Sequence, residues 1–175
     1  IMLVMFSYGS MLSFIALYGI DIGVSNSGYF FILLSVGIGL SRILSGRIMD
    51  RSGPRLVTIA GIVMLTFGFP ILALIQTTWG FHLSALLLGL GFGIVMATFQ
   101  TMVNNLVIPQ RRGAANSTLF SGFDLGIGIG MLTTGFISHW IGLSGAFLVC
   151  AGINLGALML FNGYVVGRYM ERKKF

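Results

Sequence analysis

Two charged side chains lie inside long apolar runs of this sequence, where a charge is costly to keep. Arg42 precedes Gly46 by four residues, and Asp124 lies about seven residues into the run that starts at Ser117. At a rise of 1.5 Å per residue, they lie about 6 and 10 Å from the basic ends of their helices. An isolated charge deep in a bilayer costs on the order of 2.5–3.5 kcal/mol. We therefore expect Arg42 and Asp124 to pair, or to share a water-filled cavity.

Two interpretations of this pair stay open. It is either a structural ion pair, or Asp124 exchanges a proton while Arg42 tunes the pKa of its carboxyl group. Metal chemistry is not expected, because Cys150 is the single cysteine and because His82 and His139 lie far apart. We predict no metal site, no catalytic residue and no cofactor.

The segment GRIMDRSGPR, residues 46–55, holds four of the fourteen charged side chains and lies between two apolar runs. Gly46 would let helices pack closely where one of them leaves the membrane, and Gly53 suits a turn. Asp50 can face the positive N-terminus of a nearby helix. The arginines can pair with acidic groups or carbonyl oxygens. We expect this loop to brace the helices around it.

The composition indicates a protein solvated by lipid. Hydrophobic residues make up 56% of the 175 residues and charged residues only 8%, with a mean hydropathy of +0.98. Soluble domains carry about 25% charged residues, so this chain could not cover a soluble surface. The net charge of +6 sits in short loops between apolar runs, which is not the pattern of a nucleic-acid binder.

Six apolar runs are long enough to cross a bilayer as helices, which takes roughly 20 residues each. No alternating pattern of the kind found in membrane strands appears. We therefore expect an all-α integral membrane protein with one six-helix bundle. The expected spans are residues 1–20, 29–46, 56–76, 81–103, 117–140 and 145–167.

Basic residues alternate between the two sets of loops, which predicts the orientation. One side receives only Asp21 and the aromatic residues of an interfacial belt, including Trp79 and Trp140. The positive-inside rule makes the other side cytoplasmic, with both chain ends on that side. The basic residues on that side are Arg47, Arg51, Arg55, Arg111, Arg112, Arg168, Arg172, Lys173 and Lys174.

Small residues at spacing of four predict close helix contacts. The fifth span carries two such faces, one with Gly122 to Thr134 and one with Asp124 and Gly128, so it should be packed on both sides. Asn116 is expected to cap this span. The expected close-packing pairs are Gly89 and Gly93, Gly126 and Gly130, and Gly152 and Gly156.

The loop at residues 46–55 resembles the signature G-x-x-x-D-R-x-G-R-[RK] of the major facilitator superfamily. Gly46, Asp50, Arg51 and Gly53 match it, while Pro54 departs from it by occupying a position that is usually basic. Segments 41–46, 109–113 and 123–130 are similar to the C-terminal half of bacterial drug:proton antiporters.

This resemblance implies a fold and a function. The chain would be the C-terminal six-helix half of a twelve-helix transporter in the cytoplasmic membrane, working by alternating access. Implied partners are the N-terminal six-helix half, a small-molecule substrate, a coupling proton and the lipid bilayer, with no nucleic acid. Cavity candidates are Ser10, Phe14, Gln100 and Asp124. Residues with a conformational or gating role would be Gly46, Arg47, Asp50, Arg51, Gly53 and Arg55.

Alternatives stay open at this point. A natural six-helix channel or membrane scaffold would have the same spans, although no repeated pore motif is visible. Residues 142–145, GLSG, match a pattern of intramembrane serine proteases, but no histidine follows Ser144 to activate it. Because Ile1 opens inside an apolar run, we expect the sequence to start in the middle of a longer protein.

Overall fold

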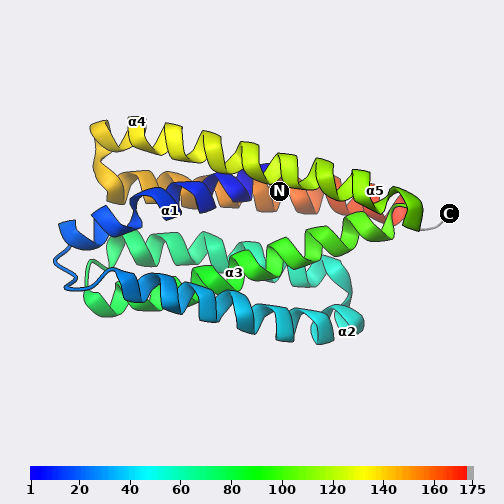
Figure 1. Ribbon diagram of the computed structural model, residues 1–175, viewed down its shortest axis with the longest axis horizontal. Coiled ribbons are helices and arrows are strands. Elements are labelled where there is room, and N and C mark those ends of the chain that lie inside the picture. Colours follow the sequence, from blue (N-terminus) through cyan, green and yellow to red (C-terminus); the bar gives the residue numbers. More distant parts are fainter. Residues whose placement is uncertain (173–175) are drawn as a thin grey trace.

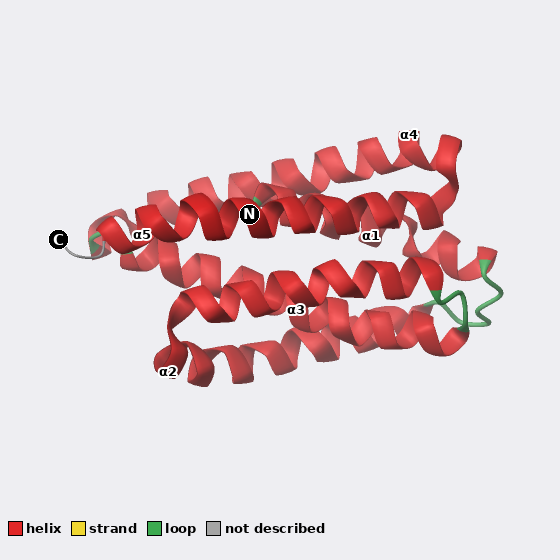
Figure 2. Ribbon diagram, turned by 180° about the vertical axis from the view of Figure 1, so that it is seen from behind, coloured by secondary structure: helices red, strands yellow, loops and turns green. Residues whose placement is uncertain are grey.

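The fold is a bundle of long helices that run along its long axis (Figures 1 and 2). The computed structural model describes residues 1–172, and these contain no strand. The side chains of Leu44, Arg47, Asp50, Arg51, Ser52, Met170, Glu171 and Arg172 lie outside the description. The elements are α1 (Met2–Asp21), α2 (Gly28–Leu74), α3 (Thr78–Asn105), the 3₁₀ turn η1 (Pro109–Arg111), α4 (Arg112–Leu160), the π-helical segment η2 (Phe161–Val165) and α5 (Val166–Arg172).

Both α2 and α4 fold back on themselves at a single glycine, so that each has two antiparallel arms (Figure 1). Gly53 has φ 75° and ψ 164°, and Gly142 has φ 74° and ψ 170°. This region of backbone space is essentially open to glycine alone. Pro54 then opens the second arm of α2, where its missing N–H costs nothing. The arms are residues 28–52 and 54–74 of α2, and 112–141 and 143–160 of α4.

The helices are apolar enough to cross a membrane. By length and composition, four helical stretches qualify: Met2–Asp21, Gly53–Leu74, Thr78–Asn105 and Pro109–Tyr169, the last of which contains the break at Gly142. Gly28–Ile43 is a shorter apolar helix. The count of six spans therefore stays a prediction. The helix extends beyond the predicted span at the start of α4, which begins at Arg112 rather than at residue 117.

Glycines bring two pairs of helices into backbone contact. A Cβ at Gly126 or Gly130 would overlap the backbone carbonyls of Met2 and Phe6, so α1 lies directly on the first arm of α4. In the same way, Gly89 contacts the backbone of Leu34 and fixes α3 against α2. Both contacts were predicted from the spacing of small residues. The third expected pair, Gly152 and Gly156, makes no such contact within the described residues, because nothing lies within 4 Å of a Cβ at either position.

The two ends of the bundle differ in chemistry. At one end, Arg55 donates a hydrogen bond to Asn162 (2.8 Å), and the Arg168 guanidinium lies 4.9 Å from the centre of the Tyr164 ring. The break of α2, the α3–α4 connection and the C-terminus lie at this end (Figure 1). Trp79 and Trp140, near the connections at the other end, are 87% and 74% exposed. Exposed indoles are typical of a membrane interface.

Candidate functional site

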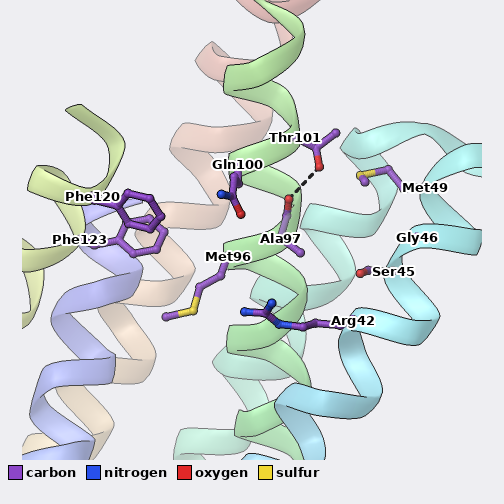
Figure 3. Close-up of a pocket in the computed structure, with 10 residues that line it drawn as sticks. All are labelled: Arg42, Ser45, Gly46, Met49, Met96, Ala97, Gln100, Thr101, Phe120 and Phe123. Atoms are coloured by element: carbon purple, nitrogen blue, oxygen red, sulfur yellow. Dashed lines mark hydrogen bonds between the residues drawn. The ribbon is translucent and has the colours of Figure 1, made fainter. Parts of the chain in front are cut away.

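A hollow of about 510 Å³ lies between α2, α3 and the first arm of α4 (Figure 3). Its volume falls in the range of small-molecule sites, about 300–1,000 Å³. Among the described residues that line it, Arg42 is the one charged side chain. The lining residues are Arg42, Ser45, Gly46 and Met49 from α2, Met96, Ala97, Gln100 and Thr101 from α3, and Phe120 and Phe123 from α4.

Helical periodicity explains how these side chains reach one space. Arg42, Ser45 and Met49 follow one another at intervals of three and four residues, so they share a face of α2. On α3, Ala97 and Gln100 continue the face that Gly89 begins. As small residues give way to longer ones along this face, the tight α2–α3 contact opens into the hollow.

The polar groups of the hollow differ in how far they are already satisfied. The Thr101 hydroxyl donates to the carbonyl oxygen of Ala97 (3.0 Å), as Figure 3 shows. Gln100 and Arg42 are both exposed, and neither makes a side-chain hydrogen bond to another described residue. Figure 3 shows Arg42 reaching from α2 across α3 toward Met96. Within the described part of the chain, these two polar side chains have no partner and could contact a ligand.

The other intramembrane charge lies elsewhere. Asp124 is exposed and lines a separate, open hollow of about 560 Å³ on the first arm of α4, together with Ser121 and Gly128. Within the described part of the chain, Arg42 and Asp124 make no ion pair. The structure thus brings Gln100 and Arg42 together, and it does not bring Asp124 to them.

Ser10 and Phe14 lie in the α1–α4 contact rather than in the hollow. Ser10 is fully buried; its hydroxyl accepts from Thr134 (2.6 Å) and can donate to the carbonyl oxygen of Phe6 (2.8 Å) or of Gly130 (3.2 Å). Phe14 is half-buried, with its ring against Gly135. In this structure both residues contact α4, and their place in a cavity wall of a complete transporter stays a prediction.

The residues of the loop at 46–55 have separate locations. Gly46 lines the hollow and has nothing within 4 Å of a Cβ, so the close packing expected there is not made. Gly53 forms the break of α2, and Arg55 donates a hydrogen bond to Asn162 in η2. The side chains of Arg47, Asp50 and Arg51 lie outside the described residues.

Several site residues were missed from the sequence, because nothing distinguishes a cavity-facing Met or Phe from a core one. Phe120 and Phe123 form an edge-to-face pair with ring centres 5.4 Å apart, and Met49 and Met96 complete the apolar wall. The one available signal was that Met49 and Met96 lie four residues from Ser45 and Gln100, on the polar faces of α2 and α3. Asn116, expected to cap a helix, instead lies inside α4.

The Asn116 amide connects α4 to α3 at the basic end of the bundle. Its Nδ2 donates to Asn104 Oδ1 (2.8 Å) and to the carbonyl oxygen of Arg112 (3.0 Å). Because α4 begins at Arg112, the cap position had already passed by residue 116. The amide therefore bridges two helices close to the hollow.

Ser144 belongs to a hydrogen-bond network at the opposite end. Its hydroxyl accepts from Gln76 Nε2 (2.9 Å) and donates to Tyr18 Oη (3.4 Å), and Tyr18 in turn donates to the carbonyl oxygen of Leu72 (2.8 Å). These bonds join α1, α2 and α4. Ser144 thus connects helices, and neither of its described side-chain partners is a histidine that could activate it.

This fold and the loop motif define a class of protein. The chain belongs to the Major Facilitator Superfamily, whose sequence profile matches residues 1–175. This confirms the resemblance predicted from residues 46–55. The chain is therefore a multi-pass membrane protein of a transporter family, not an enzyme.

Among individual proteins, the chain is similar to several called multidrug resistance protein MdtH. It is 32% identical to that of Proteus mirabilis (strain HI4320) over 140 residues, covering 78% of this chain and 33% of the relative. It is 28% identical to that of Cronobacter sakazakii (strain ATCC BAA-894), covering 75% and 36%. It is 27% identical to that of Escherichia coli O1:K1 / APEC, with the same coverage. The chain thus spans about a third of the length of these relatives.

Proposed function

We propose that this chain forms one half of a secondary active transporter that moves a small molecule across the membrane by alternating access, as proton-coupled efflux. The observation that carries this proposal is the hollow at Arg42 and Gln100, which has the volume of a small-molecule site and lies within an apolar bundle. The matched relatives are named as multidrug resistance proteins, which supports export of small molecules.

We propose that the N-terminal six-helix half of the same protein covers the face of α4 that carries Asp124. Facing lipid, this carboxylate would cost on the order of 2.5–3.5 kcal/mol. Beside it, Gly128 has nothing within 4 Å of a Cβ, so another helix could approach closely here. The face of small residues that carries Asp124 and Gly128 therefore supports contact with helices outside this chain.

The chemistry of the two ends supports an orientation. We propose that the end with Arg55 and Arg168 lies in the cytoplasm, together with both chain ends, and that the membrane is the bacterial inner membrane. Exposed Trp79 and Trp140 would then lie at the outer interface. The loop at 46–55 would brace this cytoplasmic end and take part in gating.

We propose Asp124 as the group that carries the coupling proton, because it is the exposed intramembrane carboxylate of the described chain. In this arrangement the substrate and the proton use different hollows on the two sides of the first arm of α4. Movement of this arm would couple them.

Efflux from cells that produce the complete natural protein tests the proposal. Cells loaded with a panel of small aromatic compounds should retain less of at least one compound than cells with an empty vector. An uncoupler that collapses the proton gradient should remove this difference. Equal retention of every compound, with the protein present in the membrane, would refute transport. A difference that survives the uncoupler would refute proton coupling alone.

A further inference from the structure

The lining of the hollow is chemically one-sided. Arg42 from α2 and Gln100 from α3 offer N–H donors, Phe120 and Phe123 form an apolar wall on α4, and Met96 of α3 lies between Arg42 and these rings (Figure 3). Among the described lining residues no acidic side chain balances the guanidinium. Asp124, the residue that follows Phe123 in the sequence, lines a different hollow.

The Arg42 guanidinium is the strongest recognition element in this space. It carries five N–H donors in a planar fork that matches a carboxylate, sulfonate or phosphate. Among the described residues, none accepts a hydrogen bond from it. A positively charged ligand would be repelled here, and an anionic one would supply the missing partner.

The apolar wall favours a flat aromatic body. The Phe120 and Phe123 rings meet at an interplanar angle of 77°, and Phe120, which is 46% exposed, can pack against a third aromatic group. Met49 and Met96 have flexible thioether side chains that adapt to irregular shapes. Such a wall accepts many aromatic frameworks of one general size.

We propose that this hollow binds aromatic amphiphilic anions, with the anionic group on Arg42, an acceptor atom on Gln100, and the ring system against Phe120 and Phe123. The inference rests on the proposed transport function, since it assigns the substrate class to the same hollow. Arg42 is then the residue that determines charge specificity, and it is not part of a proton-coupling pair.

Three naphthalene probes that differ mainly in charge test this inference: 1-naphthaleneacetate, 1-naphthaleneacetamide and 1-naphthylmethylammonium. Binding is measured by calorimetry with the complete protein in nanodiscs, and uptake with the same protein in liposomes. The wild-type protein should bind the anion about tenfold more tightly than the amide. It should bind the cation more weakly than either.

Arg42→Gln should reduce the ratio of anion to amide affinity about tenfold, and Arg42→Lys should keep part of it, because lysine retains the charge but not the fork. Arg168→Gln is the matched control: Arg168 is an arginine outside the hollow, stacked on Tyr164. It should leave the ratio unchanged. Thermal unfolding of each variant identifies any that fail to fold, in which case the wild-type preference and the lysine variant decide.

Two results would overturn the inference while leaving transport intact: a wild-type preference for the cation, or an Arg42→Gln variant with an unchanged ratio. No binding of naphthaleneacetate to the wild-type protein would also overturn it. Binding with the predicted preference but no uptake under a proton gradient would instead overturn the transport function. The two failures are therefore distinguishable.

Discussion

Arg42 and Asp124, the two charges inside apolar helices, line separate hollows: Phe123 lines the hollow of Arg42, whereas the next residue, Asp124, lines the other one. Consecutive residues on a helix are turned by about 100°, because there are 3.6 residues per turn. One residue step along α4 thus separates a hollow lined by an arginine from a hollow lined by a carboxylate. The two charges can serve different ligands.

Asp124→Asn should uncouple transport from the proton gradient. Proton-driven accumulation should fall about tenfold or more, because asparagine cannot release a proton. Exchange of labelled for unlabelled substrate, which needs no net proton movement, should persist. Both rates are measured in liposomes that contain the complete protein.

Asp21→Asn is the control for this variant, since Asp21 is an exposed carboxylate at the end of α1. It should leave both rates unchanged. Full proton-driven accumulation by the Asp124→Asn protein would mean that the coupling proton is carried elsewhere.

Ala97→Trp should block transport by filling the hollow, because Ala97 is a small residue in its wall. The maximal rate should fall at least about tenfold, with normal amounts of protein in the membrane. Ala60→Trp places the same side chain on the exposed surface of the second arm of α2 and should transport normally. Equal rates for the two variants would show that substrate does not pass this hollow.

Gly130→Ala should destabilise the bundle, because its Cβ would overlap the carbonyl of Phe6 on α1. Overpacking of this kind costs about 1–3 kcal/mol. Gly152→Ala, in the same long helix but with open space around it, should be neutral or gain up to about 1 kcal/mol of helix propensity. Thermal unfolding in detergent compares the two. A higher midpoint for Gly130→Ala than for Gly152→Ala would contradict the α1–α4 contact.

Gly53→Ala should destabilise the turn between the arms of α2, because alanine at φ 75° and ψ 164° is strained. The expected loss is about 1–3 kcal/mol. Gly46→Ala, with nothing near its Cβ, should not lower the unfolding midpoint. If both variants unfold like the wild-type protein, α2 does not fold back at Gly53.

The sequence predicted the helical fold and two of its contacts well, because these depend on short-range patterns. Apolar runs marked the helices, and small residues at spacing of four marked the contacts of Gly89 and Gly126. The family followed from the loop at residues 46–55. Each of these patterns lies within one short segment, so it can be recognised without knowing which helices are its neighbours.

The direction in which a side chain faces could not be predicted in the same way. Sequence distance placed Arg42 and Asp124 at similar depth, but pairing also requires that both face one space. Ser10 looked like a cavity residue because it is polar; in the fold its hydroxyl bonds Thr134 and Gly130 across a helix contact. Both outcomes depend on how whole helices are rotated against each other.

The most direct test of the central claim, that the hollow is this half's part of an alternating-access pathway, is the labelling of a Gln100→Cys variant of the complete protein. Cys150 is fully buried, so the native thiol of this chain should stay unreactive. A membrane-impermeant maleimide is added to right-side-out or inside-out vesicles, with and without a transported compound. The proposal predicts reaction from both sides, in proportions that change when the compound binds. Reaction from one side only, unaffected by any transported compound, would contradict it.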